Sequence, residues 1–161
     1  MPISLRRLTL ALCAGGALGL TACKKHQEPA PDTRSQREIW LTTPGWSMQT
    51  IKDELTTPAG VVTTSTSTPA SLFDPCHLDD LTRFNADRTF TVDDGPIKCP
   101  QPATSSTNTW SFAANETEIL FSNATKSNKI TTLTATTLAL TYNETYPDGT
   151  MWTQTVTYAA K

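Results

Sequence analysis

The stretch LTRFNADRTFTV (81–92) alternates polar and apolar residues on both sides of a polar tetrapeptide, NADR. In an antiparallel hairpin, directly opposed residues have numbers with a constant sum, and side chains on one face recur every second residue. Pairing Phe84 with Phe90 therefore places Thr82 opposite Val92 on the same face. The stretch predicts a β-hairpin with two aromatic rings on one face.

Two further stretches have the same pattern, NTWSFAANETEILF (108–121) and TLALTYNETYPDGTMWTQTVTY (137–158). In each of them the large apolar residues share one face and Thr, Ser or Ala fill the other. One-sided sheets of this kind must close on a core. The opposed pairs that the turns predict are Trp110 with Phe121, Phe112 with Ile119, Leu138 with Val156, Leu140 with Gln154, and Tyr142 with Trp152.

About eight antiparallel strands follow one another along the chain. They are the strands of the three hairpins, a first strand at Trp46 and a strand near 130–133. This order predicts an all-β, up-and-down barrel, and a two-sheet sandwich is the alternative. Between the first two strands, TTPAGVVTTSTSTPA (56–70) is interpreted as a long loop over one end of the domain. The 31 threonines among 161 residues also favour strands over long helices.

The N-terminal segment has the order of a bacterial export signal. Arg6 and Arg7 precede an apolar run (8–20) that is too short to span a bilayer as a helix. The run ends in Leu-Thr-Ala-Cys, which resembles the lipobox of bacterial lipoproteins, whose cysteine receives a diacylglyceryl group. We therefore expect Cys23 to be lipidated, unless the segment is an ordinary secretory signal with a chance cysteine.

The resulting domain assignment is a lipoprotein signal peptide (1–22), a lipidated flexible tether (23–37) and a β-barrel domain (38–161). No aspartate follows Cys23, which favours the outer membrane over retention in the inner membrane. Removal of the signal takes away Arg6 and Arg7, so 11 basic and 15 acidic side chains remain and their net charge is −4. Such a chain has no basic stripe for nucleic acid.

The four cysteines divide between the two parts of the chain. Cys13 leaves with the signal and Cys23 is the lipid site. The remaining pair, Cys76 and Cys99, lies near the open ends of the 81–92 hairpin. In an exported protein this pair predicts a disulfide, and a metal site would need more ligands than the nearby His77.

The sequence contains no set of residues that would carry catalysis. His77 lies near Asp74, Asp79 and Asp80 in a polar loop. A single histidine in such a loop is usually exposed to solvent and has no catalytic role. The run beginning at Asn85 starts like a calcium loop but lacks the glycine and glutamate that such a loop requires. No nucleophile with a base and no phosphate loop can be assembled. We expect a protein that is not an enzyme and holds no metal or cofactor.

Several motifs together resemble the bacterial lipocalin-like domain family of small lipoproteins. They are Cys76-x₂-Asp79-Asp80-x₃-Phe84-Asn85-x-Asp87-x-Thr89-Phe90, Asp94-Gly95, Cys99, Thr109-Trp110-Ser111-Phe112, and Ile130-x₂-Leu133-Thr134-x₃-Leu138. The resemblance covers roughly 39–158 and implies a lipocalin-like barrel with a binding role and an early tryptophan, Trp46, that closes the base. Arg88 replaces the family's usual turn glycine, so Asn85 or Asp87 is expected to take the left-handed conformation.

The inward-facing side chains either line a pocket or fill the barrel, since eight strands are just wide enough for one small ligand. A hollow barrel predicts a small apolar ligand, and a filled barrel predicts a protein-binding or inhibitor module acting through loops 56–75 and 93–108. The candidate ligand-binding residues are Trp46, Phe84, Phe90, Trp110, Phe112, Leu140 and Trp152.

Overall fold

The computed structural model of the chain describes residues 32–100 and 108–161. The predicted signal peptide, Cys23 and most of the predicted tether lie outside these residues. Residues 33–161 form one unit, to which the following description applies. Its helical segments are α1 (Gln36–Thr42), α2 (Pro69–Leu72) and the 3₁₀ turn η1 (Pro75–His77).

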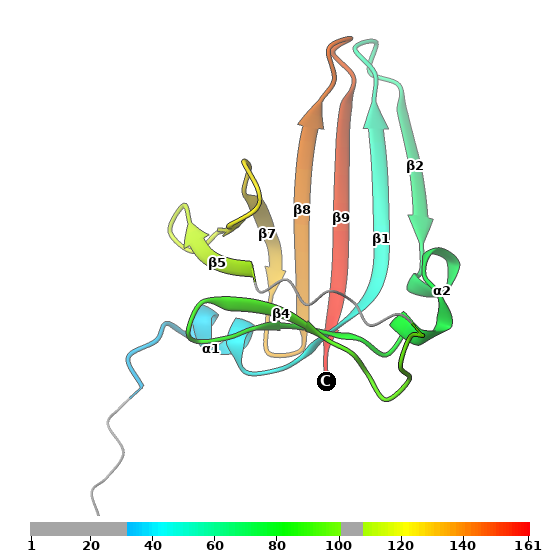
Figure 1. Cartoon of the computed structure of the whole chain (residues 1–161). Coiled ribbons are helices and arrows are strands. Elements are labelled where there is room, and N and C mark those ends of the chain that lie inside the picture. The colour runs from blue at the N-terminus through cyan, green and yellow to red at the C-terminus, as the bar shows by residue number, and fades with distance from the viewer. Residues whose placement is uncertain (1–31, 101–107) are drawn as a thin grey trace, which may run out of the picture. The chain divides into compact units, whose positions relative to one another are not determined.

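The strands of this unit form a closed antiparallel barrel (Figure 1). Eight strands make the ring in chain order, from β1 through β3 to β9 and back to β1, and β2 pairs with β1 outside the ring. The up-and-down barrel is therefore confirmed and the sandwich alternative is wrong. The strands are β1 (Trp46–Thr56), β2 (Val62–Ser67), β3 (Leu81–Phe84), β4 (Thr89–Asp93), β5 (Asn108–Ala113), β6 (Glu118–Phe121), β7 (Asn128–Leu133), β8 (Thr137–Thr145) and β9 (Met151–Ala160).

The ring is closed unevenly along its length. β9 pairs with β1 from Trp46 to Thr56, but β1 meets β3 through the single pair Trp46 and Thr82. β4 with β5, and β6 with β7, share two pairs each. The long strands β1, β8 and β9 therefore continue past the others, and with β2 they form an open sheet (Figure 1). One end of the barrel is tight and the other is open.

Strand β2 corrects the prediction of a loop over 56–70. Val62–Ser67 pairs with β1 from Thr56 back to Ile51, after a turn in which Gly60 takes a φ of +81° and the Thr57 amide donates to the Val61 carbonyl at 2.9 Å. The segment has no apolar face, so the alternation that marked the other strands is missing. Its β-branched threonines nevertheless favour extended backbone.

The predicted registers of the β3–β4 and β5–β6 hairpins are confirmed. The β8–β9 register is two residues away from the prediction, with Leu140 opposite Val156 and Tyr142 opposite Gln154. The turn is responsible, because Gly149 takes a φ of +84° and the Tyr146 amide donates to the Thr150 carbonyl at 2.8 Å. An even shift keeps every side chain on its predicted face.

Arg88 itself takes the left-handed conformation in the β3–β4 turn, with a φ of +71°, so the expectation that Asn85 or Asp87 would do so is wrong. The Arg88 guanidinium lies 4.5 Å from the Trp110 ring centroid and 2.9 Å from a carboxylate oxygen of Glu38. These contacts offset the backbone strain.

Helix α1 and Trp46 fill the tight end. Ser35 caps the helix by accepting a hydrogen bond from the Glu38 amide at 3.0 Å, so the last two residues of the predicted tether, 36 and 37, lie in the helix. Leu41 and Trp46 are both fully buried, and the Trp46 indole N–H donates to the Leu41 carbonyl at 2.9 Å. The rest of the buried core comprises Phe84, Trp110, Ile119, Ile130, Leu133, Leu138 and Leu140.

The β5–β6 turn stores backbone strain that a glycine would relieve. Ala114, Asn115 and Glu116 have φ values of +47°, +55° and +64°. A Cβ atom in this region costs about 1–2 kcal/mol, and the greater freedom of an unfolded glycine offsets part of the gain. We expect Ala114→Gly to raise the free energy of unfolding by about 0.5–1 kcal/mol in urea titrations. Ala113→Gly, in the adjoining strand, should lower it, and a loss in both variants would contradict this account.

Candidate functional site

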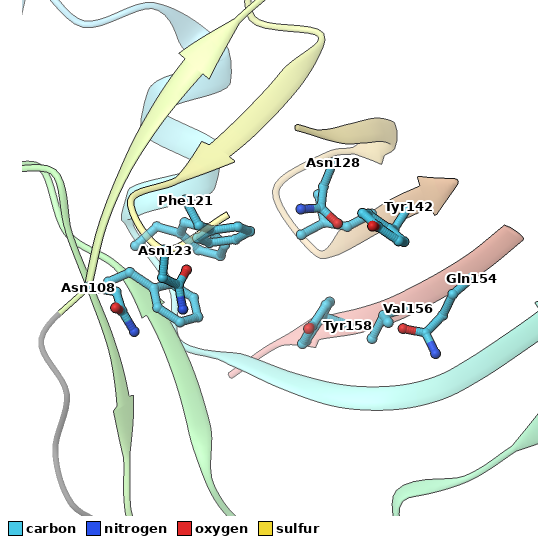
Figure 2. A pocket seen from close by; sticks show the side chains of 11 residues that line it. Asn108, Phe121, Asn123, Asn128, Tyr142, Gln154, Val156 and Tyr158 are labelled. Carbon is cyan, nitrogen blue, oxygen red and sulfur yellow. The ribbon is translucent and has the colours of Figure 1, made fainter. Parts of the chain in front are cut away.

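A cavity of about 290 Å³ lies inside the barrel, between the short strands and the long sheet. Its walls come from β3 to β9 (Figure 2). The lining residues are Phe84, Phe90, Asn108, Phe121, Asn123, Asn128, Leu140, Tyr142, Gln154, Val156 and Tyr158.

Three phenylalanine rings form one wall of the cavity. Phe84 and Phe90 pack edge to face with centroids 5.2 Å apart, and Phe90 meets Phe121 in the same way at 5.0 Å. Phe84 also packs against the buried Trp110 ring at 5.7 Å. Because the rings contact one another, this wall is fixed before any ligand arrives. The barrel is thus filled at its tight end and hollow above it. Of the two alternatives drawn from the sequence, the filled barrel describes the tight end and the hollow barrel describes the part above it.

Polar side chains lie on both sides of the cavity. Asn108 and Asn123 lie on the side of Phe121, and Asn128 lies beside Tyr142 on the other side (Figure 2). Gln154 and Tyr158 line that second side together with the apolar Val156. Side-chain amides both donate and accept hydrogen bonds. The cavity therefore combines apolar surface with neutral hydrogen-bonding groups that lie on both of its sides.

The predicted ligand-binding residues divide into three groups. Phe84, Phe90 and Leu140 line the cavity. Trp46 and Trp110 belong to the buried core of the tight end, and Phe112 packs on Trp110 at a centroid distance of 5.2 Å. These three lie outside the cavity lining because the barrel narrows toward α1.

Trp152 also lies outside the cavity, further along β9. Its indole N–H donates to Asp53 at 2.9 Å, and its ring packs on Tyr142 at 5.9 Å. The Gln154 amide donates to the same Asp53 oxygen at 3.0 Å. The Asp53 carboxylate thus lies beside the cavity-lining Gln154, and the Lys126 ammonium lies 5.9 Å from the ring centroid of Tyr142, so charges of both signs lie near the cavity.

The predicted ligand-binding residues include none of the polar residues that line the cavity. Tyr142 and Phe121 could have been included, since both were already placed on an inward face by their hairpin sums. Asn108 and Asn128 begin β5 and β7 in phase with the buried Trp110 and Ile130, but the prediction counted only apolar side chains as inward. Asn123 lies in the connection between β6 and β7, where alternation carries no signal. The three asparagines line one cavity only because the ring closes.

Tyr158 is the lining residue with a clearly shifted pKa, which burial raises to about 12. In the unfolded chain a tyrosine loses its proton near pH 10. The stability that the buried, protonated Tyr158 contributes is therefore intact below about pH 10 and is lost as the pH rises through 12. We expect the free energy of unfolding to fall by about 2 kcal/mol over this range. Urea titrations of the wild type and Tyr158→Phe at both limits test this, because the fall should be smaller in the variant. Equal losses would contradict it.

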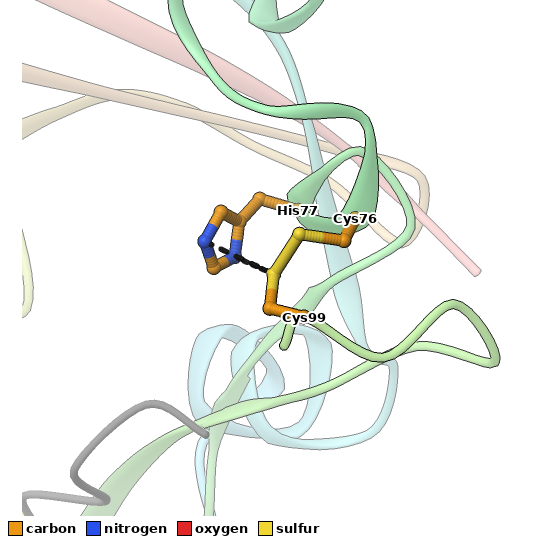
Figure 3. A group of neighbouring side chains, drawn as sticks. All are labelled: Cys76, His77 and Cys99. Atoms are coloured by element: carbon orange, nitrogen blue, oxygen red, sulfur yellow. Dashed lines mark hydrogen bonds between the residues drawn. A yellow bond between two sulfur atoms is a disulfide. The ribbon is translucent and has the colours of Figure 1, made fainter. Parts of the chain in front are cut away.

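The predicted disulfide between Cys76 and Cys99 is confirmed, with Cα atoms 5.2 Å apart. It joins η1 to the segment after β4. Ligand atoms of both cysteines and His77 lie within 4.8 Å of one another (Figure 3). The sulfurs are bonded to each other, so neither is a thiolate that would bind a metal ion.

A second hollow of about 300 Å³, which we call the outer groove, lies between the start of β1, α2, η1 and the β3–β4 hairpin. Among its walls, Phe73, Leu78 and Val92 are 43%, 39% and 55% exposed. The groove is lined by Met48, Pro69, Phe73, His77, Leu78, Asp80, Thr82 and Val92. It includes part of the segment that was predicted as loop 56–75.

No family model, curated protein or solved structure matches this chain. Function is therefore inferred from the residues and geometry of the barrel. Within the described residues, no helix is both long and apolar enough to cross a membrane.

Proposed function

We propose that this chain is a cell-envelope lipoprotein whose lipocalin-like barrel binds a small, uncharged, amphipathic molecule without catalysing a reaction. The observation that carries the proposal is the cavity with its phenylalanine wall and its amide and phenol side chains. Its volume of about 290 Å³ is at the lower end of ligand pockets, which span roughly 300–1,000 Å³.

The chemistry of the lining defines the ligand class. An apolar or aromatic part would pack on Phe84, Phe90 and Phe121, and a neutral polar part would bond to the amides and phenols. None of the 11 lining residues is an acid, a histidine, a lysine or an arginine. Burying an unpaired charge there would cost several kcal/mol.

The lipoprotein part rests on the sequence alone. The basic, apolar and Leu-Thr-Ala-Cys parts occur in the order that such a signal requires. Acyl chains on Cys23 would hold the barrel at a membrane surface, and the residue after the cysteine favours the outer membrane.

A filling substitution tests the cavity. Val156 faces the cavity and Thr153 lies on the opposite face of the same strand. Residues 23–161 carrying Cys23→Ser should bind the uncharged probe N-phenyl-1-naphthylamine with a rise in its fluorescence. Val156→Trp should weaken this binding at least tenfold, about 1.4 kcal/mol or more. Thr153→Trp is the matched control and should bind like the parent. Equal binding by both variants would place the site elsewhere.

A protein-binding module is the second candidate. The observation that favours it is the outer groove, whose apolar side chains Phe73, Leu78 and Val92 are exposed. Exposed apolar surface of this kind marks interaction sites. Phe73→Ser should then abolish capture of the partner protein and leave binding of the fluorescent probe unchanged. Val156→Trp should weaken binding of the probe and leave capture of the partner unchanged.

A further inference from the structure

We propose that the free edge of β2 is an interface between two copies of this chain, whose β2 strands pair antiparallel about a two-fold axis at Thr64. β2 lies outside the ring and, in the described part of the chain, pairs with β1 alone. Figure 1 shows it at the margin of the open sheet. This surface is separate from the barrel cavity and from the outer groove.

The edge of β2 lacks the features that keep strand edges from pairing. Proteins protect such edges with charged side chains, prolines or bulges. None of the 6 residues of β2, VTTSTS, is charged or a proline. The register with β1 runs without a bulge, and every residue of β2 before Ser67 is exposed. The edge therefore presents a regular, accessible row of backbone N–H and C=O groups.

The turn between β1 and β2 shows which backbone groups form this row. The Thr57 amide donates to the Val61 carbonyl at 2.9 Å, so these two residues are a hydrogen-bonded pair. Hydrogen-bonded and non-hydrogen-bonded pairs alternate along an antiparallel ladder. The odd-numbered residues of β2 therefore bond to β1. The even-numbered residues, Val62, Thr64 and Thr66, direct their N–H and C=O groups away from it.

The turn between β8 and β9 leads to the same assignment independently. The Tyr146 amide donates to the Thr150 carbonyl at 2.8 Å, so even-numbered residues of β9 bond to β8 and odd-numbered ones bond to β1. Between Lys52 and Thr56 those odd-numbered residues pair with even-numbered residues of β1. The odd-numbered residues of β1 are thus left for β2, and they pair with its odd-numbered residues.

The outward groups of β2 are complementary to a second copy of themselves. They occur at every second residue and are centred on Thr64. A two-fold axis at this residue places Thr64 opposite Thr64 of the second copy, and Val62 opposite Thr66. Each of these pairs exchanges both of its N–H···O bonds, so no outward group of the three residues is left unpaired. The pairing uses the edge of both copies, and association therefore stops at a dimer.

The side chains along the seam also suit a second copy. Val62, Thr64 and Thr66 share one face of the sheet, and opposed pairs of β-branched side chains stabilise antiparallel strands. None of them is charged, so no like charges oppose each other. On the neighbouring strand the same face carries Lys52 and Glu54, which pair with each other at 3.3 Å and leave no net charge beside the seam.

Sedimentation equilibrium tests the dimer. Residues 23–161 with Cys23→Ser should change from a one-chain to a two-chain mass as the concentration rises from about 1 µM to about 500 µM. Thr64→Pro removes an N–H that does not bond to β1 and is central to the seam. It should weaken dimerisation about tenfold or more. Thr64→Val is the matched control, since it keeps the N–H and a β-branched side chain, and it should dimerise like the parent.

A one-chain mass at every concentration would overturn the proposal. So would equal dimerisation of the Thr64→Pro and Thr64→Val variants, or masses that continue to rise beyond two chains.

Amide exchange followed by NMR tests the register without a substitution in the strand. In dilute samples the amides of Val62, Thr64 and Thr66 should exchange fast, because they face solvent, and those of the odd-numbered residues should be protected. At the dimer-forming concentration the three fast amides should slow about threefold or more. Exchange at these amides that does not depend on concentration would overturn the proposal.

Mixing labelled with unlabelled chains identifies the opposed residues. The proposed axis places Thr63 opposite Ser65 of the second copy as a non-hydrogen-bonded pair, with Cα atoms about 4.5 Å apart. A nuclear Overhauser effect between their α-protons is expected across the two copies. Contacts between the copies at other residues alone would show that the interface lies elsewhere.

Discussion

Replacing Trp46 with alanine should lower the free energy of unfolding by about 4 kcal/mol, the loss typical of a large buried aromatic side chain. Trp46 is 0% exposed, and its removal leaves the Leu41 carbonyl without the indole donor. The same residue makes the pair with Thr82 that joins β1 to β3. The substitution therefore removes packing, a buried hydrogen bond and support for ring closure together.

Trp152→Ala is the matched control for this experiment. Trp152 is half-buried on the open sheet and bonds to Asp53 at 2.9 Å. Its loss should cost about 1–2 kcal/mol, because less surface is buried and water replaces the lost partner. Denaturant titrations of both variants give the comparison. An equal or smaller loss for Trp46→Ala would show that the tight end does not stabilise the barrel.

Replacing Cys23 with serine should move the protein completely from the membrane fraction to the soluble fraction, or leave it with an uncleaved signal. Each buried CH₂ of an acyl chain contributes about 0.8 kcal/mol, so two or more chains hold a protein firmly and their loss releases it. Cys13→Ser lies within the predicted signal peptide and serves as the control. It should leave membrane fractionation and metabolic palmitate labelling unchanged. Palmitate labelling of the Cys23→Ser chain would contradict the lipobox assignment.

The barrel was predictable because its hairpins carry large apolar residues at every second position. Phe84 with Phe90 and Trp110 with Phe121 were paired correctly from residue numbers alone. The β8–β9 register was predicted wrongly, because the turn centres on Asp148, one residue beyond the centre that the predicted pairs require, and both registers satisfy the same alternation. β2 was missed because its threonines and serines bury no face.

The candidate site was predictable only in part, for a geometric reason. Alternation identifies which side chains point inward, but the height at which each one lies depends on how the strands are staggered. Trp46 and Phe90 face the same interior, yet one fills the tight end and the other lines the cavity. The positions of Asn123 at the cavity and of His77 near Cys99 both depend on connections between strands, and they follow from the closed fold.

Native mass spectrometry of the exported chain tests the central claim most directly. Residues 23–161 with Cys23→Ser, purified from the periplasm without detergent, should carry one small neutral molecule that is released on unfolding. The Thr153→Trp variant should carry the same molecule, and Val156→Trp should lack it. Finding no bound molecule, or the same molecule on both variants, would contradict the assignment of the barrel cavity as the binding site.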